Sequence, residues 1–248
     1  SNYRLASVSF TQAASITPRP LSVIGSMVAD KVYDGTNSAS LSSLGTLQGL
    51  VEGESLQLQA SARFDQQDAG LRSALISYQL LDARADATRM RSGATATAPV
   101  GLASNYQLRE AQQSVVARIT PKEVWIEGAS VASKTYDGTT DAVLNPGIIK
   151  GLIGDEQLNL QGFARFDHAN AGTQHANARF LLRDSVSPTG AFSLASNYTL
   201  KTPILTLQAD IKPRTVFITG TQVLDKVYDG TSAVTITGGK LEGVLAGE

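Results

Sequence analysis

The sequence predicts an all-β protein, built from tandem repeat modules of a β-sandwich or β-groove type in an elongated array. Three observations predict this fold class. The chain contains an internal repeat, its apolar residues alternate with a period of two, and turn signals arrive about every eight to twelve residues. No stretch shows the apolar stripe of an amphipathic helix.

The internal repeat is carried by several markers that keep their order and spacing. K-V-Y-D-G-T at Lys31–Thr36 returns as K-T-Y-D-G-T at Lys134–Thr139 and as K-V-Y-D-G-T at Lys226–Thr231. S-N-Y begins at Ser1, Ser104 and Ser196, and I-x-P begins at Ile16, Ile119 and Ile211. We therefore expect an excerpt of a longer array: the tail of one repeat (1–18), two full repeats (19–121 and 122–213) and the head of another (214–248).

Alternation identifies the strands within each repeat. The segments that follow the proline markers hold apolar residues two positions apart, at Leu21 and Val23, Val124 and Ile126, and Val216 and Ile218. This spacing puts both side chains of a pair on one face of a strand. We expect about six or seven strands in each repeat.

Glycines and Asp-Gly pairs mark the turns. For the glycine that closes each of these strands we expect a β-bulge or a close backbone approach, at Gly25, Gly128 and Gly220. The Asp-Gly pair within Y-D-G-T predicts a hairpin turn, because Gly tolerates positive φ and Asp bonds the local backbone. The preceding tyrosine is expected to lie over the core with its hydroxyl at a polar rim, at Tyr33, Tyr136 and Tyr228.

Two further features concern the connections. The first repeat is longer than the second near Ala83–Thr95, as expected of a tolerated surface-loop insertion. Pro18, Pro121 and Pro213 interrupt strand pairing and are expected to mark the repeat junctions. Junctions without a Gly/Ser linker predict a stiff succession of modules.

Composition excludes several classes of function. The net charge of −1 argues against nucleic acid as a partner, since phosphate binding needs a basic excess. No apolar run approaches the roughly 20 residues of a spanning helix, so no direct membrane insertion is expected. The chain has no Cys, which excludes disulfides and thiolate ligands, and the nucleophile and phosphate-loop motifs of enzymes do not occur.

The candidate ligand-binding residues are aromatic. Tyr3, Tyr106 and Tyr198 could stack on sugar rings if exposed, although recurrent strand tyrosines more often belong to the core. Trp125 is the only tryptophan, and the equivalent positions hold Ser22 and Phe217. It faces away from the apolar pair of its strand, so it is either exposed or at a module interface.

Metal and covalent chemistry have weaker support. His168 and His175 read best as solvated loop residues, and Asp65, Asp68, Asp155 and Asp167 as turn and cap residues rather than calcium ligands. We expect no metal and no other cofactor.

The recurring lysines Lys31, Lys134 and Lys226 allow two interpretations. One is an isopeptide bond to Asn105 or Asn197. The other, which we favour, is an aliphatic stem that covers the sheet while the amine pairs with a nearby carboxylate or carbonyl.

The ordered markers resemble a known family. K-x-Y-D-G-T, G-x-x-x-G-[DE] at Gly49–Glu54 and, shifted by one position, at Gly151–Asp155, A-R-F-D before Ala-Gly, and L-A-S-N-Y-x-L before I-x-P are similar to the YDG-type repeat. That repeat occurs in large bacterial surface proteins of the filamentous-haemagglutinin-like kind, often exported by two-partner secretion. The resemblance implies all-β modules, extracellular display and an adhesive or spacer role. It supplies no catalytic residue.

Three classes of function follow from these observations. We favour a structural and interaction segment of a secreted or surface-anchored adhesin in cell adhesion or biofilm, whose partners are neighbouring repeats and exopolysaccharide or other matrix components. The alternative is a dedicated carbohydrate-binding module that recognises exopolysaccharide through exposed aromatics. A glycan hydrolase is the third class and would need two close carboxylates in a cleft. We expect no enzyme.

Overall fold

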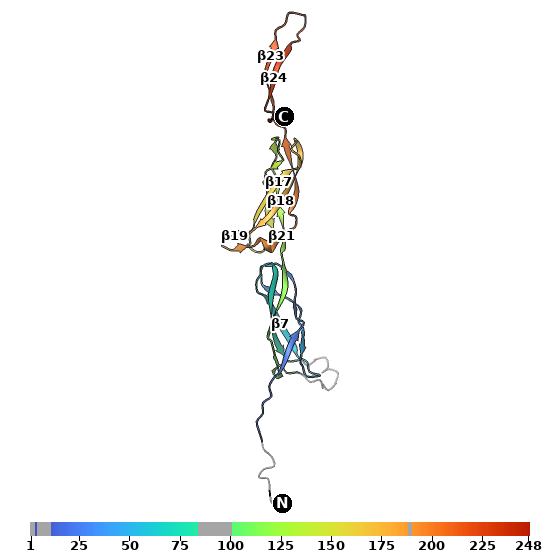
Figure 1. The fold of residues 1–248 in the computed structure, drawn as a ribbon, viewed down its shortest axis with the longest axis vertical. Helices are drawn as coiled ribbons and strands as arrows, with labels where there is room; N and C mark the ends of the chain where they lie inside the picture. The colour runs from blue at the N-terminus through green and yellow to red at the C-terminus, as the bar shows by residue number, and fades with distance from the viewer. Residues whose placement is uncertain (1–2, 4–10, 84–100, 188–189) are drawn as a thin grey trace, which may run out of the picture. The chain divides into compact units, whose positions relative to one another are not determined.

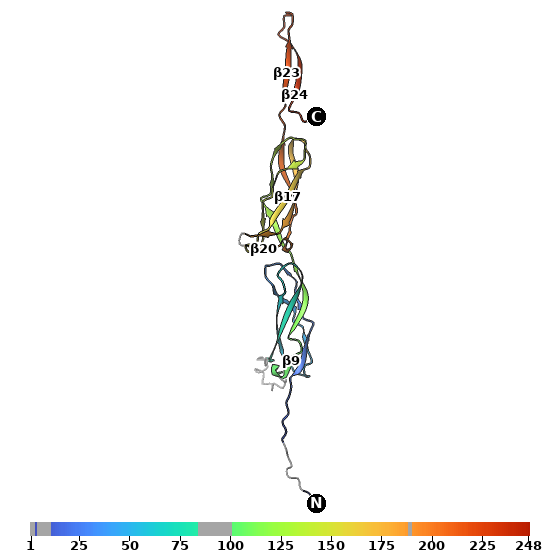
Figure 2. The same ribbon diagram turned by 60° about the vertical axis from the view of Figure 1, so that its left-hand side comes forward.

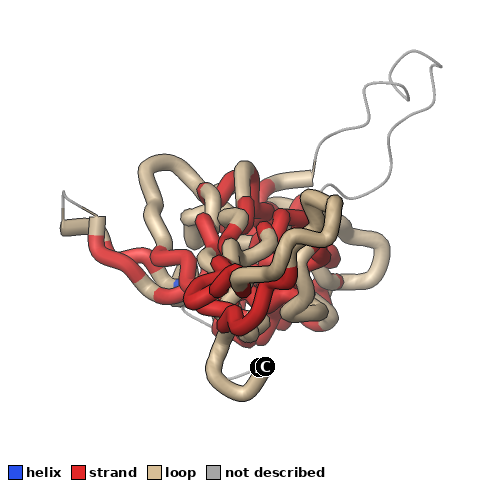
Figure 3. The backbone as a smooth tube through the Cα atoms, turned by 90° about the horizontal axis from the view of Figure 1, so that it is seen from above, coloured by secondary structure: helices blue, strands red, loops and turns tan. Residues whose placement is uncertain are grey.

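The computed structural model describes residues 3, 11–83, 101–187 and 190–248, and its regular structure is almost entirely β-strand (Figure 3). The all-β prediction is confirmed. The chain divides into two compact units, Ser1–Thr120 and Pro121–Glu248. The insertion near Ala83–Thr95 lies, apart from Ala83, outside the described residues.

Ten strands occur among the described residues of the first module, more than the expected six or seven, because several are only two or three residues long. They are β1 (Arg19–Ile24), β2 (Met27–Val28), β3 (Lys31–Val32), β4 (Ser38–Ala39), β5 (Leu41–Ser43), β6 (Thr46–Gln48), β7 (Gln57–Phe64), β8 (Gly70–Leu81), β9 (Tyr106–Leu108) and β10 (Gln112–Thr120). A short 3₁₀ turn, η2 (Ala103–Asn105), leads into β9.

The strands of this module form two main sheets. A three-stranded sheet has the order β6-β1-β9, in which β1 pairs antiparallel with β6 and parallel with β9. A five-stranded sheet has the order β3-β10-β8-β7-β4, and β2 pairs with β5 in a small sheet of its own.

The second module repeats this topology. Its strands are β11 (Lys122–Glu127), β12 (Ser130–Val131), β13 (Lys134–Thr135), β14 (Asp141–Ala142), β15 (Leu144–Asn145), β16 (Ile148–Lys150), β17 (Asn159–Phe166), β18 (Gly172–Arg183), β19 (Ser185–Val186), β20 (Phe192–Ser193), β21 (Tyr198–Leu200) and β22 (Ile204–Lys212), with the 3₁₀ turn η3 (Ala195–Asn197). The sheets have the orders β16-β11-β21 and β13-β22-β18-β17-β14. A hairpin of β19 and β20 stands out from this body (Figures 1 and 2).

In the two complete modules the Y-D-G-T turn is not a hairpin, which corrects the sequence prediction. In the first module it connects β3 to β4, which lie at opposite edges of the five-stranded sheet. Only residues 33–37 separate these strands, and five residues span at most about 20 Å. The sheet must therefore curl until its two edges approach, and the turn closes it.

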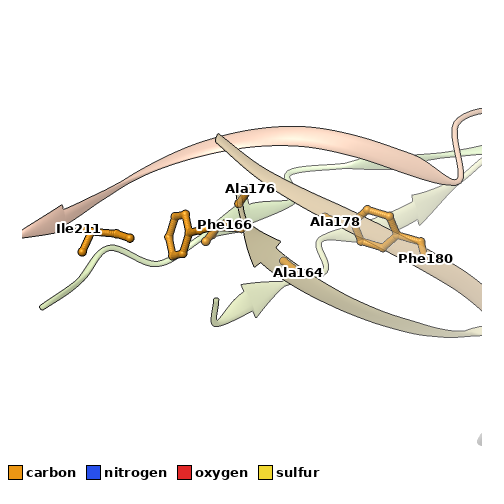
Figure 4. Packing of buried hydrophobic residues seen from close by; sticks show 7 residues of the cluster. Ala164, Phe166, Ala176, Ala178, Phe180 and Ile211 are labelled. Atoms are coloured by element: carbon orange, nitrogen blue, oxygen red, sulfur yellow. The ribbon is translucent and has the colours of Figure 1, made fainter. Parts of the chain in front are cut away.

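The core of each module lies inside this curled sheet. In the second module the small Ala176 and Ala178 lie between the rings of Phe166 and Phe180, and Ile211 lies beside Phe166 at the end of the cluster (Figure 4). Small residues beside the rings allow the strands to pack at the density of a folded interior. Burying one such ring stabilises the fold by about 1.5–3 kcal/mol.

Two glycines near the end of β11, Gly128 and Gly147, are required for different reasons. Gly128, after β11, has φ +76°, and a Cβ there would meet nothing within 4 Å. The expected close approach lies instead at Gly147, where a Cβ would be 2.3 Å from the Glu127 carbonyl oxygen. Gly128 is therefore required by its backbone conformation alone, whereas Gly147, with φ +74°, is required also by the backbone that packs against it.

The remaining strands are β23 (Phe217–Leu224) and β24 (Thr235–Glu242), which pair antiparallel in a two-stranded ribbon (Figure 1). The third K-V-Y-D-G-T lies in the loop between them. No helix among the described residues has the length and apolarity that a membrane crossing requires.

Candidate functional site

Each Y-D-G-T turn is held by a hydrogen-bonded cluster, which we call the edge clasp: Lys31, Asp34 and Thr36 in the first module. The Lys31 Nζ donates to Asp34 Oδ1 at 2.7 Å, to the Thr36 carbonyl at 2.8 Å and to Thr36 Oγ1 at 3.2 Å. The Thr36 backbone N–H and hydroxyl both donate to Asp34 Oδ1, each at 2.9 Å. Lys134, Asp137 and Thr139 repeat every one of these bonds.

The lysine of the edge clasp also contacts a buried core phenylalanine. The amine of Lys31 lies 5.8 Å from the centroid of the buried Phe64 ring, and that of Lys134 lies 5.8 Å from Phe166. These are cation–π distances. The recurring lysine thus lies over the ring and its amine pairs with a nearby carboxylate and carbonyl, the pairing that the favoured interpretation predicted.

The third copy shows that the edge clasp is a local structure. Lys226, Asp229 and Thr231 form the same bonds at 2.9 Å in the loop of the β23–β24 ribbon. Among the described residues this amine has no cation–π partner, and the Lys226 side chain is 32% exposed against 17% for Lys31. The turn therefore forms from its own residues, and the sheet adds the burial.

The geometry gives the lysine a structural role. The Lys134 amine donates to three oxygen acceptors, and all three belong to its own turn and not to Asn105 or Asn197. The hydrogen bond from Lys134 holds the pKa of the Asp137 carboxyl at about 2, below its ordinary value of 3.8. An ionised Asp and a protonated Lys are the species that this arrangement requires.

We expect the Asp137→Asn variant to lose stability near neutral pH but not in acid. The folded-state pKa of Asp137 lies below the unfolded value, so its ionised form stabilises the fold above about pH 4. That contribution disappears as pH falls from about 4 through about 2. Thermal unfolding midpoints of parent and variant should therefore converge over this interval. An equal gap at pH 2 and pH 7 would contradict the ionic role.

A second recurring contact ties the G-x-x-x-G-[DE] loop to the strand that follows the 3₁₀ turn. The Tyr106 hydroxyl donates to Glu54 Oε2 at 2.6 Å and accepts the Val51 backbone N–H at 3.2 Å. In the second module Tyr198 donates to Glu156 at 2.8 Å and accepts the Ile153 N–H at 3.0 Å. We call this contact the tyrosine latch.

The tyrosine latch refines the sequence alignment of the modules. The structural equivalent of Glu54 is Glu156, whereas the motif pointed to Asp155. Burial raises the pKa of the Tyr198 hydroxyl, and the nearby Glu156 carboxylate adds to this rise. The hydroxyl therefore stays protonated and serves as a donor.

Replacing Tyr198 with Phe should reduce the free energy of unfolding by about 1–2 kcal/mol, because Glu156 and the Ile153 N–H both lose the hydrogen bond to the Tyr198 hydroxyl. Tyr228→Phe is the control, since that side chain is 93% exposed and should change stability little. Urea titrations of both variants would measure the difference. Equal effects would mean that the tyrosine latch contributes no net stability.

The four aromatic candidates lie in different environments. Tyr106 and Tyr198 are 6% and 5% exposed, so their ring faces are not open to a ligand. Tyr3 is 94% exposed and Trp125 50%. Trp125 lies on β11 against Gly151, where an added Cβ would be 2.8 Å from its ring. Sugar binding at Trp125 and Tyr3 stays a prediction.

The polar candidates do not converge. His168 is exposed in the turn after β17, and His175 lies on β18, not in a loop as expected, with its ring 3.5 Å from Gln208. Asp167 accepts a hydrogen bond from Asn177 at 2.6 Å. Among the described residues, no three His, Cys, Asp or Glu side chains gather in a metal-binding arrangement.

Comparison with protein families identifies one domain in two copies. The YDG domain matches residues 17–114 and again residues 120–204. Both matches include an edge clasp, and the residues of both tyrosine latches lie within them. Searches of curated proteins and of solved structures gave no match.

Proposed function

This chain belongs to the YDG domain family, with two consecutive copies, and on that premise we propose that it is a structural and interaction segment of a bacterial adhesin. The parent protein is of the filamentous-haemagglutinin-like kind, exported by two-partner secretion and secreted or anchored at the cell surface. The role proposed for the segment is non-catalytic, in cell adhesion or biofilm.

One observation supports this proposal above the others: the residues that recur between modules form hydrogen bonds with one another that hold the fold together. The lysine, aspartate and threonine of each edge clasp bind one another. The tyrosine and glutamate of each tyrosine latch do the same. An enzyme would be expected to repeat, or to concentrate in one module, a set of reactive groups with open access.

The short connection between the two modules supports a role as a spacer. The last strand of the first module ends at Thr120 and the first strand of the second begins at Lys122, so Pro121 alone separates them. A connection this short, with proline in it, has far fewer conformations than a Gly/Ser linker. Repeated modules also multiply weak contacts with matrix components, because each bound module raises the effective concentration of the next.

The proposal is tested by displaying one reporter adhesin domain on two kinds of tether. One is the 248-residue chain, and the other is a Gly/Ser tether with the same number of residues. Cells with the folded tether should remain attached to a ligand-coated surface at higher shear, and the isolated chain should associate with biofilm matrix. Equal retention together with no matrix association would refute the proposal.

A further inference from the structure

The outer face of β17 and β18 carries an exposed patch that no architectural role uses. Phe163 lies directly opposite Arg179 across the two strands, and Gln161 lies opposite Leu181. Ile204 on β22 lies opposite Arg179 from the other side. The apolar members are well exposed, Phe163 by 62%, Leu181 by 51% and Ile204 by 46%.

A surface groove of about 610 Å³ accompanies this patch. Its lining includes Phe163, Arg179, Leu181 and Gln161, together with Pro146 and the buried Phe180. Within the described part of the chain, the Arg179 side chain forms no hydrogen bond and no ion pair. The groove therefore presents an aromatic ring, an aliphatic wall and one uncompensated cation.

The first module provides an internal comparison at the same strand register. Ser61 lies opposite Ser77 there, and the positions of Leu181 and Ile204 hold Gln79 and Gln112. The corresponding groove is about 350 Å³ and is lined by small and amide side chains together with the buried Tyr78. The backbone arrangement is thus shared, while the apolar and cationic surface belongs to the second module alone.

We propose that this groove of the second module binds an acidic polysaccharide, with the face of a uronic acid ring on Phe163 and its carboxylate on Arg179. Planar guanidinium binds carboxylate through two parallel hydrogen bonds. The C–H face of a sugar ring matches an exposed aromatic face. The Gln161 side-chain oxygen accepts a hydrogen bond from Arg183 Nε at 3.0 Å, which leaves its amide nitrogen to donate to a ring hydroxyl. This inference goes beyond the structural function and does not depend on it.

The size of the groove favours a saccharide over a protein partner. Small-ligand sites typically measure about 300–1,000 Å³, which includes this groove. A stable protein interface buries about 800 Å² on each partner, far more than a few side chains of two strands supply.

The test measures binding of polyuronate oligosaccharides to the whole chain by calorimetry, with uncharged glucose oligomers of equal length for comparison. We expect binding of the polyuronate only, weakened by salt. The double variant Phe163→Ser and Arg179→Ser introduces the residues of the first module, which that fold already accommodates. It should weaken binding about tenfold or more, and Arg179→Gln alone should remove the preference for charge.

The reciprocal graft is the matched control. Ser61→Phe, Ser77→Arg, Gln79→Leu and Gln112→Ile should add a second site, doubling the stoichiometry. Unchanged affinity in the double variant would overturn the proposal, as would equal binding of poly-glutamate, which carries carboxylates without sugar rings. A sedimentation shift from dimer to monomer in the double variant would instead assign the face to self-association. None of these failures would affect the tether experiment.

Discussion

Replacing Phe166 with Ala should destabilise the second module by about 3–5 kcal/mol, a large part of the free energy that holds a domain of this size together. The Phe166 ring is 3% exposed, and it packs in the cluster of Ala176, Ala178 and Ile211. Truncation leaves a cavity that the strands cannot close. It also removes the ring beneath the Lys134 amine.

Trp125 makes this measurement specific to the second module, because it is the only tryptophan and lies on β11. Urea unfolding followed by its fluorescence reports the change directly. Phe163→Ala is the matched control: the same residue type on the same strand, but 62% exposed on the outer face. It should change stability by no more than about 0.5 kcal/mol. Similar losses in the two variants would contradict the assignment of the core.

Gly147→Ala is the second change with a large expected effect, a loss of more than about 3 kcal/mol. Its φ of +74° already strains any other residue, and the added Cβ would lie 2.3 Å from the Glu127 oxygen and 2.7 Å from the Ala129 nitrogen. Both contacts are with backbone, so no side chain can move to relieve them. Two turns of the module would have to separate.

Gly128→Ala isolates the conformational part of that cost. Its φ is +76°, nearly the same, but an added Cβ would meet no atom within 4 Å. We expect a loss of about 1–2 kcal/mol. The difference between the two variants, measured by the same Trp125 fluorescence, is the energy of the close approach. Equal losses of stability in the two variants would show that the backbone around Gly147 rearranges without an energetic cost.

The candidate sites were only partly predictable from the sequence. The pairing of the recurring lysine with a nearby carboxylate and carbonyl was anticipated, because all partners lie within five residues of Lys31. The tyrosine latch was not, since Tyr106 and Glu54 are 52 residues apart. The sequence signal for this contact was that both Tyr106 and Glu54 belong to the recurring markers. The pairing of Phe163 with Arg179 left no such signal in the sequence, because neither residue recurs in the first module.

The sequence by itself determined the all-β class, the tandem repeat and the internal form of the edge clasp, which appears even at Lys226 without a surrounding sheet. These features depend on alternation and on short-range hydrogen bonds, which neighbouring residues settle among themselves. Only the tertiary structure decided that the Y-D-G-T turn joins opposite edges of a curled sheet. Asp-Gly specifies only a backbone conformation. The flanking strands β3 and β4 pair with β10 and β7, and this pairing depends on the burial of side chains that are remote in the chain.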